Sequence, residues 1–353
     1  MNKLTKVGCS ALCGSLAVIS SANAGEMTVT GGVDMTWMSL DSATTGNPIG
    51  IGSNLTFKGS GELDNGWTWD IAVANSNASA YSATTVDLAM GGMGTLTLNQ
   101  GDSGNGIASY DDKMPTAWEE AWGAGLSTGV KTVVGVGAAN HIAYAAPTIL
   151  GVTISGAYAP DMGSSDTADK GTSGDGSGNA LGRGYDLAVN INPSLGTEIL
   201  SGLNLFAGGH IAEKGPNNAT YDSDLMEAVG GVTYAIGPVS IGYGRSGFVM
   251  GNKHGTSATE VAAYKGTMYG VSFNVNDSLS VSWGYHDTVV AGYVHSSGHR
   301  GDPNARKVEV ESMQIAYTMG GASVRIAETK ADNTFFSSGS NKDALTVSVG
   351  LAF

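Results

Sequence analysis

The chain has 353 residues, of which 31 are acidic and 17 are basic, giving a formal net charge of −14. This balance argues against a nucleic-acid partner, because phosphate binding needs a basic face. No run of 18 apolar residues occurs in the sequence, which excludes a membrane-spanning helix. Glycine contributes 54 residues, about twice its usual share. Because glycine weakens helices, the composition favours strands and turns.

Residues 1–24 have the pattern of a secretory signal peptide. Two lysines precede a short apolar stretch that ends in Ala22-Asn23-Ala24, which predicts cleavage between Ala24 and Gly25. The apolar stretch is too short for a transmembrane anchor. We therefore expect one mature domain, 25–353, whose net charge is −16 because both lysines leave with the signal. Both cysteines leave as well, so the exported chain forms no disulfide.

Apolar and polar residues alternate in sixteen segments of the mature chain. This period of two is typical of strands, because successive side chains point to opposite faces of a sheet. In chain order the segments lie around 27–37, 54–58, 67–73, 86–88, 96–98, 142–144, 152–158, 185–191, 203–212, 226–236, 238–246, 265–275, 278–287, 307–318, 322–330 and 345–353. An even number of strands suits a barrel with both termini on one side.

The connectors between these segments alternate between short and long. The short ones are tight-turn sequences, namely Asp64-Asn65-Gly66, Gly91-Gly92, Gly237-Pro238, Asn276-Asp277 and Gly320-Gly321. The long ones are polar and lie at roughly 41–50, 101–139, 160–183, 213–225, 247–264, 288–306 and 331–341. This asymmetry predicts an all-β fold, a transmembrane antiparallel β-barrel. A soluble β-sandwich also has many short strands, but its outward face should be polar.

The last segment is the clearest single strand. Its apolar residues share one face, and the residues between them are small or polar; the apolar set is Leu345, Val347, Val349, Leu351 and Phe353. Such a strand suits a position between lipid and a wet lumen. Because a spanning sheet leaves no edge unpaired in lipid, we expect it to pair with the first strand and close the barrel.

The connector from Gly101 to Ala139 is the longest, and long loops in compact domains are usually functional or disordered. It carries five acidic residues, Asp102, Asp111, Asp112, Glu119 and Glu120. Two interpretations stay open. The connector is either a solvated external loop, or a loop folded into the barrel whose carboxylates narrow the pore.

A short helix is predicted within this connector. Thr116-Ala117-Trp118-Glu119 has the pattern of a capping box, with Thr116 as the N-cap. Trp118 and Trp122 are four residues apart, so a helix would place both rings on one face. In the folded-in arrangement these rings pack on the barrel wall.

Charged residues also occupy polar positions of the strands. If the apolar face contacts lipid, four acids and one base point inward, namely Asp34, Asp70, Asp87, Asp186 and Lys58. An inward acid also has a purely structural use, which is to hydrate the wall. Together with the acids of the long connector, however, these residues make negative charge dominate the lumen. Rings of carboxylates favour cations in a pore, so we expect a cation-preferring channel.

Three stretches resemble general Gram-negative porins. Ser53–Gly66 is similar to the second strand and first turn of such porins, and Met93–Leu98 to the entry into their constriction loop. Asn140–Pro147 is similar to the strand that leaves this loop. With the signal peptide and the terminal Phe353, the resemblance covers essentially the whole mature chain.

This resemblance implies a channel of about 16 strands, usually a homotrimer, for passive diffusion of small hydrophilic solutes and ions. The third loop would form the eyelet, and no cofactor would be needed. The protein would lie in the Gram-negative outer membrane, in contact with lipid and lipopolysaccharide. The barrel assembly machinery would read the C-terminal strand that ends at Phe353.

The chain departs from such porins on the basic side of the eyelet. Asn54, Gln100 and Ala143 stand where arginines are common, and Lys58 is the inward basic candidate nearby. The loop from Asn75 to Ala83 is also short. The resemblance therefore does not extend to the family's cross-pore field or to its latch over a neighbouring subunit.

Motifs of other protein classes are present without their context. Gly125–Gly129 matches G-x-S-x-G but lacks a strand–turn–helix pattern around it. Gly242–Gly247 matches G-x-G-x-x-G at the end of a strand. We expect no catalytic, cofactor-binding or metal site. The alternatives are an outer-membrane hydrolase that uses His286-Asp287, a substrate-specific or adhesive barrel, and a purely structural barrel.

Overall fold

The structure is a computed structural model that describes residues 27–41, 46–77, 79–162, 181–193, 198–215, 221–252, 260–294 and 306–353. The predicted signal peptide, with its cleavage site between Ala24 and Gly25, lies outside these residues. None of the helices in the described residues has the length and hydropathy needed to cross a membrane.

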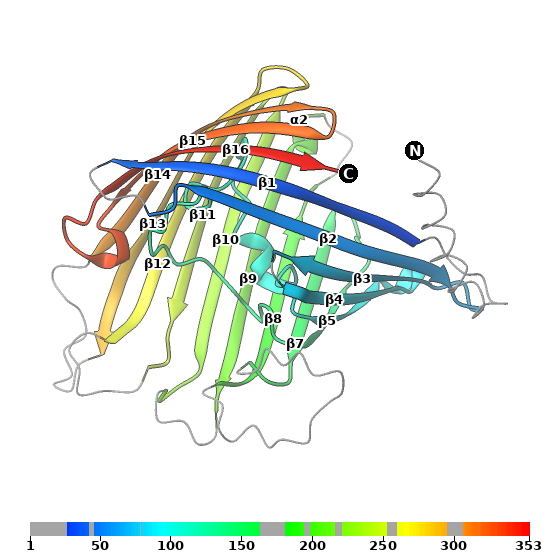
Figure 1. Cartoon of the computed structure of the whole chain (residues 1–353). Coiled ribbons are helices and arrows are strands. Elements are labelled where there is room, and N and C mark those ends of the chain that lie inside the picture. The colour runs from blue at the N-terminus through cyan, green and yellow to red at the C-terminus, as the bar shows by residue number, and fades with distance from the viewer. Residues whose placement is uncertain are drawn as a thin grey trace.

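Within the described residues, sixteen antiparallel strands form one closed barrel (Figure 1). They are β1 (Met27–Asp41), β2 (Ile49–Glu62), β3 (Thr68–Ser76), β4 (Ser79–Ala89), β5 (Thr95–Gln100), β6 (His141–Ala145), β7 (Val152–Ala159), β8 (Leu181–Ile191), β9 (Leu203–Lys214), β10 (Leu225–Ile236), β11 (Val239–Val249), β12 (Glu260–Asn274), β13 (Leu279–Val294), β14 (Lys307–Met319), β15 (Ala322–Asp332) and β16 (Lys342–Ala352). Short helical turns are η2 (Gly91–Met93), η3 (Gly106–Tyr110), α2 (Glu198–Ser201) and η4 (Thr334–Phe336). The predicted fold class and strand number are confirmed.

The barrel closes between its first and last strands. β1 pairs with β16 in a continuous register from Gly32 opposite Ala352 to Asp41 opposite Asp343. The backbone of Phe353 extends this seam by exchanging two hydrogen bonds with Gly31, of 3.0 and 3.2 Å. The predicted pairing of the terminal strand with the first one is therefore confirmed.

The two faces of the wall differ in polarity, as the period of two predicts. On β14 the alternate residues Met313, Ile315 and Tyr317 point outward and are largely exposed, whereas Ser312 and Gln314 point inward and are buried. Outward tyrosines on β11, β12 and β13 also stack side by side, with ring centroids 5.3 and 5.6 Å apart. An outward apolar surface with aromatic rows is what a lipid environment requires.

Several strands are longer than the sequence pattern indicates. The residues expected in long connectors at 247–264 and 288–306 include the first part of β12 and the last part of β13. The last part of β13 escapes detection because apolar residues stand on both of its faces, as Val289 and the buried Val290 do, so the period of two is lost. The loop expected from Asn75 to Ala83 is correspondingly shorter, since β3 ends at Ser76 and β4 begins at Ser79.

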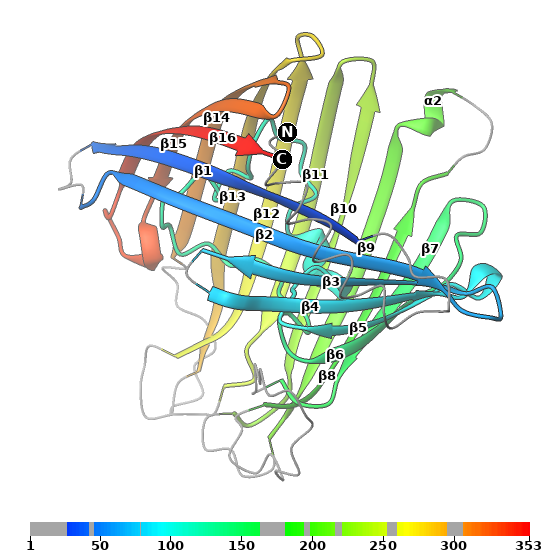
Figure 2. The same ribbon diagram turned by 45° about the vertical axis from the view of Figure 1, so that its right-hand side comes forward.

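The segment 101–140, which connects β5 to β6, runs inside the barrel (Figures 1 and 2). The buried core consists of side chains of this segment and of the inner wall. One cluster joins residues of this segment to side chains of β9–β12, including Ile107, Met114, Phe206, Phe248 and Met268. A second joins Ala121 and Leu126 to the inner face of β14, and a third joins Val136 and Ala139 to β6 and β7. The segment therefore covers much of the inner wall.

Candidate functional site

The segment 101–140 follows the inner wall so closely that glycine is required beneath it. A Cβ atom on Gly270 of β12 would lie 2.8 Å from the Pro115 carbonyl oxygen and 2.9 Å from the Met114 Cβ. A Cβ on Gly208 of β9 would lie 2.6 Å from Ile107 Cγ2. Real Cβ atoms do not approach other heavy atoms this closely, so a larger residue at Gly270 would displace the segment, and one at Gly208 would collide with the Ile107 side chain unless that residue is changed as well.

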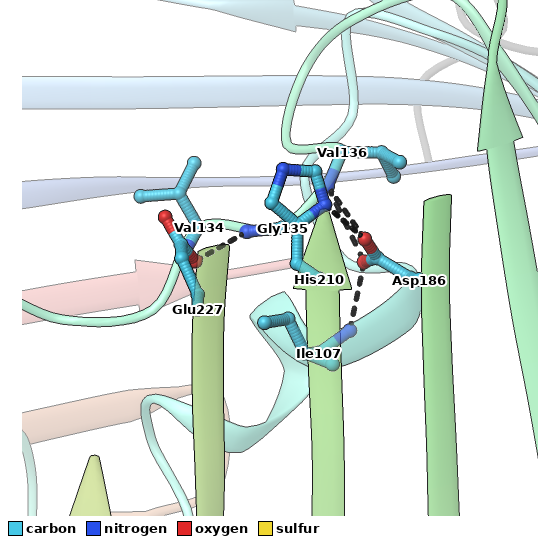
Figure 3. A network of polar contacts seen from close by, with 7 residues as sticks. All are labelled: Ile107, Val134, Gly135, Val136, Asp186, His210 and Glu227. Atoms are coloured by element: carbon cyan, nitrogen blue, oxygen red, sulfur yellow. Dashed lines mark hydrogen bonds and ion pairs between the residues drawn. The ribbon is translucent and has the colours of Figure 1, made fainter. Parts of the chain in front are cut away.

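Two acids of the wall bind the beginning and the end of the segment (Figure 3). The Asp186 carboxylate on β8 accepts hydrogen bonds from Ile107 N at 3.0 Å and Val136 N at 3.2 Å. The Glu227 carboxylate on β10 accepts hydrogen bonds from Val134 N at 2.7 Å and Gly135 N at 2.9 Å. Four backbone N–H groups of the segment thus find acceptors on two side chains, which matters because buried N–H groups need partners.

His210 lies between these two acids. It faces Asp186 across the β8–β9 register and Glu227 across the β9–β10 register. Its Nδ1 contacts Asp186 Oδ1 at 2.6 Å, and both side chains are almost fully buried. A buried carboxylate is costly unless it is paired and hydrogen-bonded, and His210 together with the segment supplies those partners. Asp186 was expected to line the pore, but it is buried beneath the segment instead.

The middle of the segment is held by neutral side chains. Gln314 Oε1 on β14 accepts hydrogen bonds from Trp118 N at 3.2 Å and Glu119 N at 3.0 Å, while its Nε2 donates to the Glu119 carbonyl oxygen at 2.7 Å. Ser282 Oγ accepts from Ala117 N at 2.9 Å, and Thr288 Oγ1 accepts from Lys131 N at 3.0 Å.

These contacts overturn the predicted capping-box helix. Residues 116–122, all of which the structure describes, form bends and turns and no helix. The reason is that Glu119 N donates to Gln314 of the wall instead of to Thr116, so tertiary contacts replace the local cap. The helical turn of the segment is η3, at Gly106–Tyr110, which the sequence pattern did not indicate.

The acids of the segment lie in a partly desolvated environment. Burial and the neighbouring Asp112 raise the pKa of the Asp111 carboxyl to about 6. Burial, followed by repulsion from Glu119, raises the pKa of the Glu120 carboxyl to about 7. Burial also raises the pKa of Glu119, against the opposing attraction of Arg325. Asp112 and Asp102 are exposed, and Asp102 N donates to Asn99 Oδ1 at 3.1 Å.

Arg325 is an inward basic residue that the sequence reasoning missed. Its Nη2 lies 2.6 Å from Asp34 Oδ1, which also accepts a 2.5 Å hydrogen bond from Ser348 Oγ. The guanidinium lies 5.2 Å from the centroid of the Trp118 ring, so it also contacts the segment. A cavity of about 590 Å³ borders Arg325, Asp34 and Asn54. The sequence alternation could have identified Arg325 as inward-facing, because it stands between the outward-facing Val324 and Ile326.

The remaining predicted lining residues occupy inward register positions. Asp70 and Asp87 stand opposite each other on β3 and β4, and Asp87 Oδ1 accepts a 2.5 Å hydrogen bond from Thr97 Oγ1. Lys58 lies between Thr28 of β1 and Ala72 of β3. Phe353 ends the seam strand and is exposed.

The motifs of other protein classes find no support in the structure. Gly242–Gly247 lies within β11, and Gly125–Gly129 lies in a part of the internal segment where residues 125–129 form no helix. His286 points to the inside of the barrel, whereas Asp287 points outward and contacts Tyr285. The two side chains therefore cannot act as a catalytic pair. No group of three or more His, Cys, Asp or Glu side chains in the described residues could hold a metal ion.

A closed sixteen-stranded barrel, apolar outside and polar inside, defines a β-barrel protein of a lipid membrane. The family model for Gram-negative porins matches residues 8–353. The chain belongs to the Gram-negative porin family, as its sequence motifs predicted, and is a multi-pass β-barrel channel of the outer membrane. Among curated proteins, none matches the sequence significantly.

Solved porins share this fold. An anion-selective porin from Comamonas acidovorans has 17% identity and a TM-score of 0.64, with 93% of this chain and 100% of that chain covered. OmpF of Salmonella typhi in complex with daunomycin has 12% identity and a TM-score of 0.63, with 93% and 98% covered. The trimer form of OmpT, an outer membrane protein of Vibrio cholerae, has 9% identity and a TM-score of 0.64, with 94% and 100% covered.

Proposed function

We propose that this porin passes small hydrophilic solutes and ions by passive diffusion and prefers cations. The observation that carries the proposal is the cluster of acids on the internal segment, namely Asp111, Asp112, Glu119 and Glu120. Asp34, Asp70 and Asp87 add negative charge to the inner wall, and Arg325 is paired with Asp34. Carboxylates inside a pore with a low-dielectric wall raise the local concentration of cations.

A salt gradient across a planar bilayer tests this preference. We expect a reversal potential of the sign that marks cations as the more permeant ions. The preference should weaken as ionic strength rises, because salt screens charges beyond about 10 Å at 0.1 M. A reversal potential of the opposite sign, which the name of the Comamonas acidovorans porin would suggest for that protein, would refute the cation preference and leave the channel itself intact.

The same proposal makes the protein a channel without enzymatic activity. It is supported by the opposite orientations of His286 and Asp287, which remove the one hydrolase candidate that the sequence offered. Liposome swelling with sugars of graded size is the direct test of diffusion. We expect swelling rates that fall with sugar size, whereas a plugged, adhesive or purely structural barrel would give none.

We propose further that the mature chain begins at Gly25 and assembles as a homotrimer in contact with membrane lipid and lipopolysaccharide. The trimer is supported by the fold shared with a solved trimeric protein. The barrel assembly machinery would recognise β16 with its terminal Phe353. N-terminal sequencing of the membrane protein tests the cleavage after Ala24, and chemical cross-linking in intact outer membranes tests the trimer.

A further inference from the structure

One carboxylate holds both ends of the internal segment. Ile107 and Val136 stand near opposite ends of the segment, yet both backbone N–H groups donate to Asp186. Both residues are buried against the wall, as is Asp186 itself. The contact therefore joins the part of the segment around Ile107 to the part around Val136, and both parts to β8 (Figure 3). These two parts are called the limbs of the segment below.

Glu227, on the other side of His210, adds a second attachment between the wall and the segment. It binds Val134 N and Gly135 N, directly before the residue that Asp186 binds. Hydrogen bonds to an ionised acceptor are roughly twice as strong as neutral ones. The hydrogen bonds that Gln314, Ser282 and Thr288 of the wall make with the segment use neutral side chains.

We propose that Asp186 and Glu227, together with His210, form a clamp whose role is to position the internal segment. By fixing both limbs, the clamp keeps the acids of the segment at a constant distance from the opposite wall. It thereby sets the width of the passage and the steadiness of the current. These are positioning residues, since Asp186 is buried and acts on solutes only through the segment. The inference rests on the proposed channel function.

The test replaces the clamp without changing its shape. In D186N/E227Q, the side-chain size is kept but the charge is lost, and part of each acceptor becomes an amide donor that opposes the backbone N–H groups. E328Q is the matched control, because it also changes a wall carboxylate to its amide, but Glu328 is exposed on the outer face, where its Oε1 lies 3.2 Å from Lys330 Nζ. Each variant is first checked for a folded barrel by its heat-dependent mobility on a gel.

Single-channel recording in a planar bilayer gives the first readout. We expect a steady current from the native porin and from E328Q, and a several-fold larger current variance with substates from D186N/E227Q. If D186N/E227Q does not fold, E227Q alone is recorded, because it keeps Asp186 and removes half of the clamp. A folded clamp variant with the current variance of the native porin would overturn the inference.

A disulfide between the segment and the wall tests whether the noise of the clamp variant comes from a loosened segment or from general damage to the barrel. The Cβ position of Gly208 lies 2.6 Å from Ile107 Cγ2, so cysteines at 107 and 208 are within disulfide reach. The mature chain offers no competing cysteine once the predicted signal is removed. In D186N/E227Q with I107C/G208C, we expect oxidation to restore a steady current and a thiol reductant to abolish it again. Unchanged noise in the oxidised, thiol-free protein would contradict the proposal.

The rate at which this disulfide forms is a second readout, and it does not depend on conduction. Under the same mild oxidant, thiol labelling should show several-fold faster bond formation when the clamp is intact than when it is removed. Equal rates would overturn the clamp. If the native protein conducts no ions but the two rates differ, the proposed channel function fails while the clamp stands.

Discussion

The limbs of the internal segment and its middle are held by different chemistry. The limbs donate four backbone N–H groups to two acids that flank a buried histidine, Asp186 and Glu227 beside His210. The middle relies on the amide of Gln314 and on the contact between Arg325 and Trp118. The acids of the middle are less buried, and they carry the charge proposed to select ions. Attachment and the proposed selectivity therefore involve different side chains, which can be changed separately.

Among the variants that compare the two regions, Asp186→Ala should lower the free energy of unfolding most. The change leaves two backbone N–H groups without their acceptor and His210 without its partner. Breaking a buried pair in this way costs about 3–5 kcal/mol. We expect the free energy of unfolding, measured by urea titration of the folded barrel in lipid, to fall by this amount. A loss below about 1 kcal/mol would show that the limbs are not the strongly held part.

A smaller loss is expected for Gln314→Ala, which removes the corresponding contact of the middle. Four hydrogen bonds disappear, three to the segment and one to Ser312 Oγ, but all of them join neutral groups. The expected decrease in the free energy of unfolding is about 1–3 kcal/mol. The same urea titration measures it. A loss equal to that of Asp186→Ala would abolish the difference between the two regions.

The raised pKa values of the middle predict a pH-dependent selectivity. An acid with a raised pKa takes up its proton at a higher pH than usual, so lowering the pH through about 7 and then about 6 neutralises Glu120 and Asp111 in turn. The cation preference should therefore decrease between about pH 8 and pH 5, and not only near the ordinary carboxyl value of about 4. Reversal potentials across this range test it, with Glu120→Gln lacking the upper part of the change.

The smallest effect on stability is expected for Arg325→Gln. Its ion pair with Asp34 is partly exposed, and such pairs contribute about 1 kcal/mol or less. The change in selectivity should be clearer, because loss of the guanidinium frees the Asp34 carboxylate and raises the cation preference. Arg325→Lys is the control that keeps the charge, and its reversal potential should stay near the native value. A shift toward anions in Arg325→Gln would contradict the arrangement.

The sequence predicts the wall well because each strand records its own orientation. Met313, Ile315 and Tyr317 alternate with buried polar residues, and this local pattern alone places them on the lipid side. The seam follows from the same pattern with one physical rule, that lipid tolerates no open edge. The pattern fails at the end of β13, where Val289 and the buried Val290 place apolar residues on both faces of the strand.

The internal segment is predicted poorly for the opposite reason. Its main contacts join backbone N–H groups to side chains far away in the sequence, such as Ile107 to Asp186, 79 residues apart. A backbone donor has no sequence signature, so the pattern at Thr116–Glu119 suggested a local cap that the fold does not use. Asp186 likewise has the sequence context of an inward wall acid, and only the fold shows it covered. Inward positions can be predicted, whereas the contacts made there cannot.

The seam between β1 and β16 sets the order of events when the protein forms. It joins the two strands that are farthest apart in the chain, so every other strand can be present while the sheet still has two free edges. Contacts between distant residues form late, because closing a long loop costs entropy before any contact is gained. Barrel closure thus waits for the last strand to be synthesised and exported. A chain that stops short of β16 retains an open edge and cannot settle stably in the membrane.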